Sequence, residues 1–236
     1  MHADKRSELD RIRSFYDSTY YRGAAAGEAI PAHLRRLARR MRVRPGMRVL
    51  DVACGTGAWL RAVTEAGGLP HGVDLSAKAI AVCRAEMPQG EFHACAAESL
   101  PFPDASFDLV TCLGSIEHFV DQEAALREMV RVARPAAEFL LLVPNADFLT
   151  RRLGLYGGTE QADVKEVVRR PEEWLRLFES CGLDVVERWR DLHVLNWRWI
   201  GARGPLRAPL RALQALALAV WPLRWQYQIY HRAGRR

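Results

Sequence analysis

A glycine-rich turn between an apolar run and a helical pattern carries the clearest chemical signal in the sequence. Residues 49–52 (Val-Leu-Asp-Val) are typical of a buried strand, and Gly55 and Gly57 follow within five residues. Glycines in such a turn let the backbone approach a ligand closely, and the helix that follows presents free N–H groups at its start. Asp74 ends the next apolar run, seventeen residues after Gly57, where a carboxylate can accept both hydroxyls of a ribose. The combination favours a nucleoside-containing cofactor over a turn that serves packing alone.

Two other nucleotide-binding patterns are absent or incomplete. The dinucleotide fingerprint G-x-G-x-x-G requires a third glycine where Leu60 stands, and no P-loop pattern occurs in the chain. The sequence also lacks a Tyr-x-x-x-Lys pair, the proton-relay pair of one class of dehydrogenases. These observations argue against an ATPase and disfavour a nicotinamide-dependent oxidoreductase, which stays an alternative.

Apolar runs alternate with helical patterns through the middle of the chain. We expect strands at 47–52, 69–75, 91–95, 107–113 and 138–144, and helices at 57–67, 77–87 (with Ser76 as N-cap) and 122–133. Such alternation predicts a parallel sheet covered by helices on both faces. The flanking regions predict helices at 8–21, 31–41 and 171–183, an irregular stretch at 145–170, and strands at 183–192 and 224–232.

Taken together, these motifs resemble those of class I S-adenosylmethionine-dependent methyltransferases, and most closely the small-molecule branch with the ubiquinone and menaquinone methyltransferases. Residues 51–57 match the family's D-x-x-C-G-T-G motif, and Asp74 matches its ribose-binding acid. Residues 97–102 match an A-E-x-L-P-F element, and residues 116–118 match the segment after the fourth strand. The resemblance implies an α/β fold: a three-layer α/β/α sandwich around a Rossmann-like, seven-stranded, mostly parallel sheet with an antiparallel last strand.

The resemblance also implies S-adenosyl-L-methionine as the cofactor. The glycines would lie beside its methionine moiety, while Leu75 and Leu113 would line the adenine pocket. The residues expected to bind the cofactor are Asp51, Ala53, Cys54, Gly55, Gly57, Asp74, Leu75, Ala97, Glu98, Leu113 and Tyr21.

Two departures from the family pattern affect this expected site. Ala53 stands where the family's first glycine lies. Ala96 replaces an acid that often precedes the A-E pair, so adenine would be recognised by the Ala97 backbone N–H or by Glu98.

His118 is the first candidate for a general base, with Glu117 beside it. It follows the fourth expected strand, at the sheet edge where ligands bind in such folds, and an imidazole can accept a proton near neutral pH. The alternative is that these two residues cap the next helix or orient a loop. Three tyrosines could close the cofactor pocket or could serve ordinary aromatic packing: Tyr16, Tyr20 and Tyr21. Asn145, after the fifth strand, could donate to a substrate or cap the following turn.

The 236-residue chain carries a net charge of +6, and that excess is local. Residues 192–236 contain eight arginines and no acidic residue, so the rest of the chain has 26 basic and 28 acidic side chains. A near-neutral body argues against nucleic acid as a partner. The five cysteines form no CxxC pair, which argues against a metal site and fits a reducing cytoplasm. No apolar run predicts a transmembrane helix or a signal peptide.

We expect a single methyltransferase domain over 1–236. Its parts would be a cap helix (1–30), the cofactor-binding core (31–192), a basic amphipathic helical insert (193–223), and the last strand and tail (224–236). In the insert, leucines and arginines can occupy opposite faces of a helix flanked by tryptophans, a pattern typical of peripheral contact with an anionic membrane surface. A substrate lid or a dimer helix are the alternatives.

The sequence thus predicts a cytoplasmic enzyme that transfers a methyl group from S-adenosyl-L-methionine to a small-molecule acceptor. A hydrophobic acceptor of lipid, quinone or lipid-linked sugar type would suit the insert. A non-catalytic methyltransferase-like binding module is the second alternative. The acceptor's identity, the methylated atom and the oligomeric state stay open.

Overall fold

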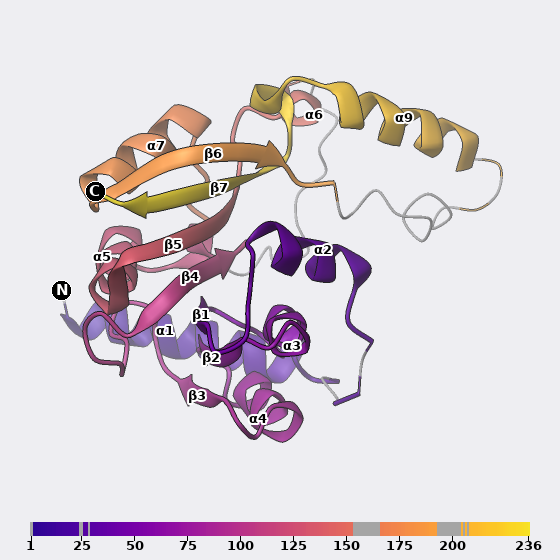
Figure 1. Ribbon diagram of the computed structural model, residues 1–236. Coiled ribbons are helices and arrows are strands. Elements are labelled where there is room, and N and C mark those ends of the chain that lie inside the picture. The colour runs from indigo at the N-terminus through magenta and orange to yellow at the C-terminus, as the bar shows by residue number, and fades with distance from the viewer. Residues whose placement is uncertain are drawn as a thin grey trace.

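The computed structural model describes residues 2–23, 26–27, 29–152, 166–192, 204, 206 and 208–236. Within these residues, seven strands form one sheet in the order β3-β2-β1-β4-β5-β7-β6 (Figure 1). The strands are β1 Arg48–Val52, β2 Leu69–Asp74, β3 Glu91–Ala94, β4 Phe107–Leu113, β5 Ala133–Pro144, β6 Leu183–Arg190 and β7 Gln228–Arg235. The chain's first strand therefore lies in the middle of the sheet, and the order reverses between β1 and β4.

Only β7 runs against the other strands. The pairs β1–β2, β1–β4, β2–β3 and β4–β5 are parallel, whereas β7 pairs antiparallel with both β5 and β6. The central strands are apolar along nearly their whole length because both of their faces are covered; Val49, Leu50 and Val52 of β1 are fully buried. The predicted fold class, including the antiparallel last strand, is confirmed.

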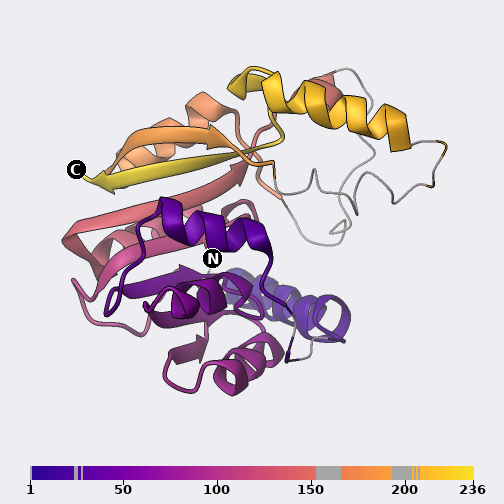
Figure 2. The ribbon, with the colours of Figure 1, turned by 45° about the vertical axis from the view of Figure 1, so that its right-hand side comes forward.

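Helices cover the two faces of the sheet (Figures 1 and 2). One face packs on α2 Ala32–Arg40, α3 Ala58–Glu65 and α4 Ala77–Glu86, which contribute Leu37, Leu60 and Ile80 to one buried cluster. The other face packs on α5 Gln122–Val132 and α7 Pro171–Ser180, whose Leu126 and Trp174 belong to a second buried cluster. The sheet is therefore the middle layer of three.

Helix boundaries follow the local signals in most places. The Ser76 side chain accepts a hydrogen bond from the Ala79 N–H at 3.2 Å, so it caps α4 as predicted. Helix α7 begins at Pro171 and is followed by Gly182 in the left-handed region, with φ of 86°. The short helices in the described residues are η1 Tyr16–Tyr20, η2 Ile116–His118, α6 Leu149–Arg152 and η3 Leu223–Trp225.

Two strand boundaries differ from the prediction. The last strand was expected at 224–232, but residues 223–225 form η3 and β7 begins only at Gln228. Strand β5 begins at Ala133, five residues before its expected start at residue 138, because residues 133–137 are also extended. The expected division into cap, core, insert and tail stays a prediction.

Two further helices in the described residues are the N-terminal helix α1 His2–Phe15 and helix α9 Ala208–Val220. Figures 1 and 2 show α9 extending beyond the end of β6 and β7. Much of the predicted insert 193–223 lies outside the described residues, and so do residues 153–165 of the stretch expected to be irregular. In the part of the chain that is described, no helix is long and apolar enough to cross a membrane.

Candidate functional site

A cavity of about 450 Å³ lies at the carboxyl ends of β1, β2 and β4, where the strand order reverses. Open parallel sheets bind ligands at this point because the loops on its two sides diverge there. The glycine turn after β1 forms one wall, the end of β2 a second, and residues 113–120 after β4 a third. Helix α1 and η1 supply a fourth wall from the N-terminus. A volume of this size suits a small-molecule cofactor or substrate.

The turn after β1 is held in a left-handed conformation at three positions. The φ angles are 60° at Ala53, 54° at Gly55 and 78° at Gly57. Glycine adopts such angles without cost, whereas an alanine loses roughly 1–2 kcal/mol. The replacement of the family's first glycine by Ala53 therefore stores backbone strain directly beside the cavity.

Asp74 connects the end of β2 to this turn. Its Oδ2 accepts a hydrogen bond from the Gly55 N–H at 2.9 Å, and its Oδ1 accepts one from the Ser76 N–H at 2.8 Å. Burial raises the pKa of this carboxyl, and the two backbone donors oppose that rise. Each carboxylate oxygen has a second lone pair, so both can still accept a hydroxyl. The Asp74 carboxylate, which lines the cavity, therefore fits the ribose of the cofactor.

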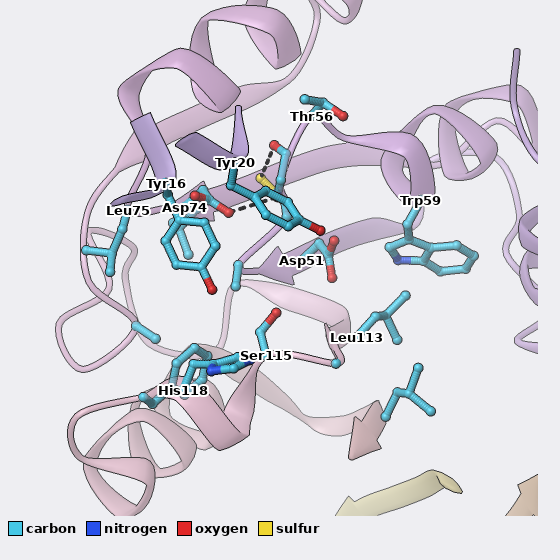
Figure 3. Close-up of a pocket in the computed structure, with 18 of the residues that line it drawn as sticks. Tyr16, Tyr20, Asp51, Thr56, Trp59, Asp74, Leu75, Leu113, Ser115 and His118 are labelled. Carbon is cyan, nitrogen blue, oxygen red and sulfur yellow. Dashed lines mark hydrogen bonds between the residues drawn. The ribbon is translucent and has the colours of Figure 1, made fainter. Parts of the chain in front are cut away.

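Asp51 lies deeper, near the centre of the cavity in Figure 3. The Thr111 hydroxyl donates to its Oδ1 at 2.6 Å, and the Trp59 indole N–H donates to that same hydroxyl at 3.1 Å. Only 3% of Asp51 is exposed, and burial raises its pKa from 3.8 to about 7. The Thr111 hydrogen bond lowers this pKa and the charge of Asp74 raises it further. Asp51 is therefore a carboxyl that a bound cation would stabilise in its ionised form.

Cys54 packs beneath the turn. Its thiol and that of Cys83 on α4 both donate to the Gly55 carbonyl, at 3.6 Å and 3.2 Å. The hydrogen bond with Cys83 and burial raise the pKa of the Cys54 thiol. A thiol held in its neutral form is a poor nucleophile, so Cys54 is a small packing residue at the cavity wall.

Three tyrosines of the N-terminal segment form a lid over the cavity. Tyr16, Tyr20 and Tyr21 all line it, and Figure 3 shows Tyr16 and Tyr20 beside Asp74 and Asp51. A Cβ atom on Gly55 would lie 2.8 Å from the Tyr21 hydroxyl, so a side chain at position 55 would collide with the lid. The three rings also pack on one another, with centroids 4.9–6.0 Å apart, so their positions agree with both roles considered, pocket closure and aromatic packing.

Asp17 attaches the lid to the start of α4. Its Oδ1 accepts from the Ser76 hydroxyl and from the Lys78 N–H, and its carbonyl accepts from Lys78 Nζ at 2.7 Å. Ser76 also donates its N–H to Asp74. The lid and Asp74 are therefore both bonded to the same serine.

The structure brings together most of the residues that the sequence suggested for the site. Those that line the cavity are Asp51, Ala53, Cys54, Gly55, Asp74, Leu75, Ala97, Glu98, Leu113, Tyr21 and His118. The carboxylate of Glu98 also accepts from the Asp121 N–H at 3.1 Å, which connects this wall of the cavity to the start of α5.

Gly57 and Glu117 were also expected in the site, but neither is among the residues that line the cavity. Gly57 lies at the N-cap of α3, where a Cβ would come within 2.7 Å of Met87 Cε and 2.9 Å of Cys83 Sγ. It is therefore required for packing between α3 and α4. Glu117 is 4% exposed, and burial raises its pKa to about 7. The charge of its carboxyl helps to raise the pKa of Tyr16, a residue that does line the cavity, so Glu117 lies close behind the cavity wall.

His118 ends η2 and faces the cavity below Ser115 in Figure 3. Its side chain is 8% exposed, and its Nε2 lies 3.9 Å from the Glu166 carboxylate. A carboxylate at this distance can orient the imidazole ring. Glu166 had no signal in the sequence, because it belongs to a segment with no periodic pattern.

Several cavity residues were not predicted. Trp59, Leu142, Tyr230 and His33 line it from α3, β5, β7 and α2, and each reaches it through packing between elements distant in sequence. Two roles were considered for Asn145, donation to a substrate and capping of the following turn, and the structure shows contacts of the second kind. Its amide donates to the carbonyls of residues 224 and 226, and its oxygen accepts from the Asp147 N–H at 2.8 Å. Asn145 is 1% exposed and does not reach the cavity.

Comparison with known proteins assigns this site to a family. Residues 50–141 match the methyltransferase-domain family. A demethylmenaquinone methyltransferase of Beutenbergia cavernae is 30% identical over 218 residues, which cover 84% of this chain and 89% of that protein. A ubiquinone biosynthesis O-methyltransferase of Aromatoleum aromaticum is 29% identical over 157 residues, covering 60% of this chain and 66% of that protein. The chain belongs to the methyltransferase-domain family.

Solved structures agree on the fold. The 1,6-didemethyltoxoflavin-N1-methyltransferase of Burkholderia thailandensis, determined with S-adenosylhomocysteine, aligns with a TM-score of 0.62 at 18% identity. The alignment covers 99% of this chain and 88% of that one. The protein is an S-adenosylmethionine-dependent methyltransferase with a small-molecule acceptor. Its cofactor is S-adenosylmethionine, and the nicotinamide alternative is not favoured.

Proposed function

We propose that the protein methylates a hydrophobic, ring-containing acceptor of the phenol or quinol type. The observation that carries this proposal is the lining of the cavity beyond Asp51. Apolar and aromatic side chains predominate there: Leu34, Trp59, Leu113, Leu142 and Tyr230. A ring bound against these side chains leaves water without transferring a charged group into the interior. The names of the two relatives, both of quinone biosynthesis, support the same class of acceptor.

When bound, S-adenosylmethionine supplies a methyl group on a positively charged sulfur. The residues assigned to it divide the cavity into two ends. Asp74 would accept the ribose hydroxyls, and Leu75, Ala97 and Glu98 would surround the adenine. The Asp51 carboxylate would pair with the ammonium of the methionine moiety. The chain's main contribution to the reaction is then to position two reactants in one dry space.

His118 is the proposed general base. It lines the cavity and faces the carboxylate of Glu166, which would stabilise the imidazolium formed when a phenolic proton is taken up. Glu166 would act as a positioning residue. The alternative role of His118 in holding the loop after β4 predicts no effect of its removal on turnover.

Helix α9 supports delivery of a hydrophobic acceptor from an anionic membrane surface. Its outer side exposes 69% of Leu213, 70% of Leu216 and 77% of Val220, which recur at helical spacing. Its opposite side is fixed, since Gln226 Nε2 donates to the Leu218 and Trp221 carbonyls. The surrounding segment 192–236 carries eight arginines and no acid, which complements an anionic lipid surface.

Turnover on a panel of phenols and quinols tests the acceptor class and the base together. Products are identified by a mass increase of one CH₂ unit. We expect His118→Gln to lower kcat by about 10²–10⁴-fold, the usual contribution of a general base. His93→Gln, a change at a partly exposed histidine of β3, is the matched control and should leave kcat unchanged. Full turnover by the His118 variant would remove the base, and turnover only on non-aromatic acceptors would contradict the proposed class.

Binding to liposomes tests the membrane contact. We expect the wild type to co-sediment with anionic vesicles at low salt, and the double variant Leu213→Ser, Leu216→Ser to stay in the supernatant. Equal behaviour of the two proteins would assign the exposed side of α9 to a protein contact.

A further inference from the structure

A second cavity of about 340 Å³ lies between α2 and the end of β6. Its charged lining consists of three arginines and one aspartate: Arg36, Arg40, Arg190 and Asp191. His33 and Tyr230 line both this groove and the first cavity. The two spaces are therefore neighbours, separated by one imidazole and one phenol ring.

Aromatic packing connects the two spaces. The rings of Trp189 and Tyr230 stack with their centroids 5.3 Å apart and 16° between their planes. The Arg40 guanidinium lies over the other side of Trp189, 3.9 Å from its centroid. Burial, together with the charge of Asp191, raises the pKa of Tyr230 and keeps its hydroxyl protonated. The groove beside Tyr230 thus has a flat aromatic wall with a positive charge over it.

The arginines of the groove differ in the ion pairs and hydrogen bonds that they form within the protein. Arg40 pairs with Glu187 at 2.5 Å, and Arg190 donates to the Ala219 carbonyl at the end of α9. Arg36 takes part in none of the ion pairs formed within the described residues, and its side chain is exposed on the groove face of α2. A guanidinium whose donors are all available can bind a carboxylate or a phosphate through two parallel hydrogen bonds.

The direction of the charge is also favourable. Among the lining residues, three arginines and one aspartate leave an excess of two positive charges, and Glu187, which pairs with Arg40, reduces that excess. His33, Arg36 and Arg40 recur at spacings of three and four residues, so one side of α2 presents them together.

We propose that this groove binds an anionic oxygen group, a carboxylate or a phosphate, carried by the methyl acceptor at the end remote from the methylated atom. This inference rests on the proposed function, since it requires the acceptor ring to occupy the first cavity. The groove then selects among ring acceptors: those bearing an acid on the far side of the ring gain a pairing with Arg36, and neutral ones do not. The acceptor is accordingly amphipathic, with its apolar ring against Leu142 and Tyr230.

Matched small probes test the groove. 4-Hydroxybenzoate, phenyl phosphate and the neutral 4-hydroxybenzamide are titrated into the protein saturated with S-adenosylhomocysteine, at constant ionic strength. We expect the wild type to bind at least one acid about tenfold more tightly than the amide, and Arg36→Gln to abolish that difference. The carboxylate and phosphate probes distinguish the two sources of the anionic group. Arg39→Gln, an equal loss of charge at an exposed position of α2 that does not line the groove, should preserve the preference.

Two results would overturn the inference. One is equal binding of acids and amide by the wild type, and the other is an equal loss in the Arg36 and Arg39 variants, which would indicate only a general effect of charge. Failure of the proposed function has a different signature. If the acids bind through Arg36 but no phenol or quinol is methylated, the groove stands and the acceptor class is wrong. If neutral phenols are methylated and acids gain nothing, the acceptor class stands and the groove proposal is wrong.

Discussion

Replacing Asp51 by asparagine should stabilise the protein at pH 8 while weakening its hold on the cofactor. The carboxyl is almost completely buried, and burial raises its pKa from 3.8 to about 7. Ionising a group shifted this far costs about 4 kcal/mol of folding free energy. The asparagine side chain has an NH₂ group in place of one carboxylate oxygen, and burying this group without a hydrogen-bond acceptor costs about 1–3 kcal/mol. The net gain at pH 8 should therefore be about 1–3 kcal/mol.

The stability difference between Asp51→Asn and the wild type should depend on pH. Because the pKa is higher in the folded than in the unfolded chain, the folded state binds more protons between pH 4 and pH 7. Stability contributed at this residue is therefore complete below pH 4 and falls as the pH rises through 7. Asp51→Asn cannot ionise, so its advantage over the wild type should appear at pH 8 and vanish at pH 4.

Urea unfolding followed by tryptophan fluorescence at pH 5 and pH 8 measures the stability gain of Asp51→Asn and its dependence on pH. Asp184→Asn, a change at an exposed acid of β6, is the control and should alter stability little at either pH. Thr111→Val removes the hydrogen bond that lowers the pKa of Asp51, so the loss of stability should become larger and should continue to a higher pH. If Asp51→Asn destabilises the protein equally at both pH values, the Asp51 carboxyl is not the strained, ionising group inferred from the structure.

Two further variants test the glycine turn and the lid. Gly57→Ala should lower stability by about 2–4 kcal/mol, because φ is 78° at this position and the new Cβ would collide with Met87. Gly46→Ala is the control: its φ is the same and no atom lies within 4 Å of its Cβ, so it should show the backbone cost alone. Equal melting temperatures of the two variants would exclude the collision. Asp17→Ala should detach the lid from Ser76 and so increase the rate of S-adenosylhomocysteine release about tenfold in stopped-flow fluorescence. Asp10→Ala on α1 is the control. An unchanged release rate in Asp17→Ala would mean that the lid does not control release.

The central part of the site could be predicted because its signals are local. The apolar run, the glycine turn and Asp74 lie within 26 residues, and strand–helix alternation fixes which ends of the strands meet. The Ser76 cap likewise requires only its immediate neighbours. The strained Ala53 is also visible in sequence as a non-glycine residue in a glycine position, but its φ angle is known only from the structure.

The rest of the site depends on contacts between distant segments. Tyr230 reaches the cavity because β7 inserts between β5 and β6, and His33 reaches it because α2 packs across the sheet. No sequence pattern around either residue predicts these contacts. The boundary of β7 was wrong for a similar reason. The amide of Asn145 holds the carbonyls of Arg224 and Gln226, so that η3 forms where an alternating pattern favoured a strand.

Calorimetric titration of S-adenosylhomocysteine and NADH into the wild type and Asp74→Asn tests the central claim most directly. Hydrogen bonds from two ribose hydroxyls to a charged acceptor contribute about 3 kcal/mol or more together. We therefore expect S-adenosylhomocysteine to bind the wild type with one site per chain, about 100-fold more weakly to Asp74→Asn, and NADH to bind neither. An affinity for S-adenosylhomocysteine that does not change in Asp74→Asn, or tight binding of NADH in its place, would contradict the assignment of this cavity to S-adenosylmethionine.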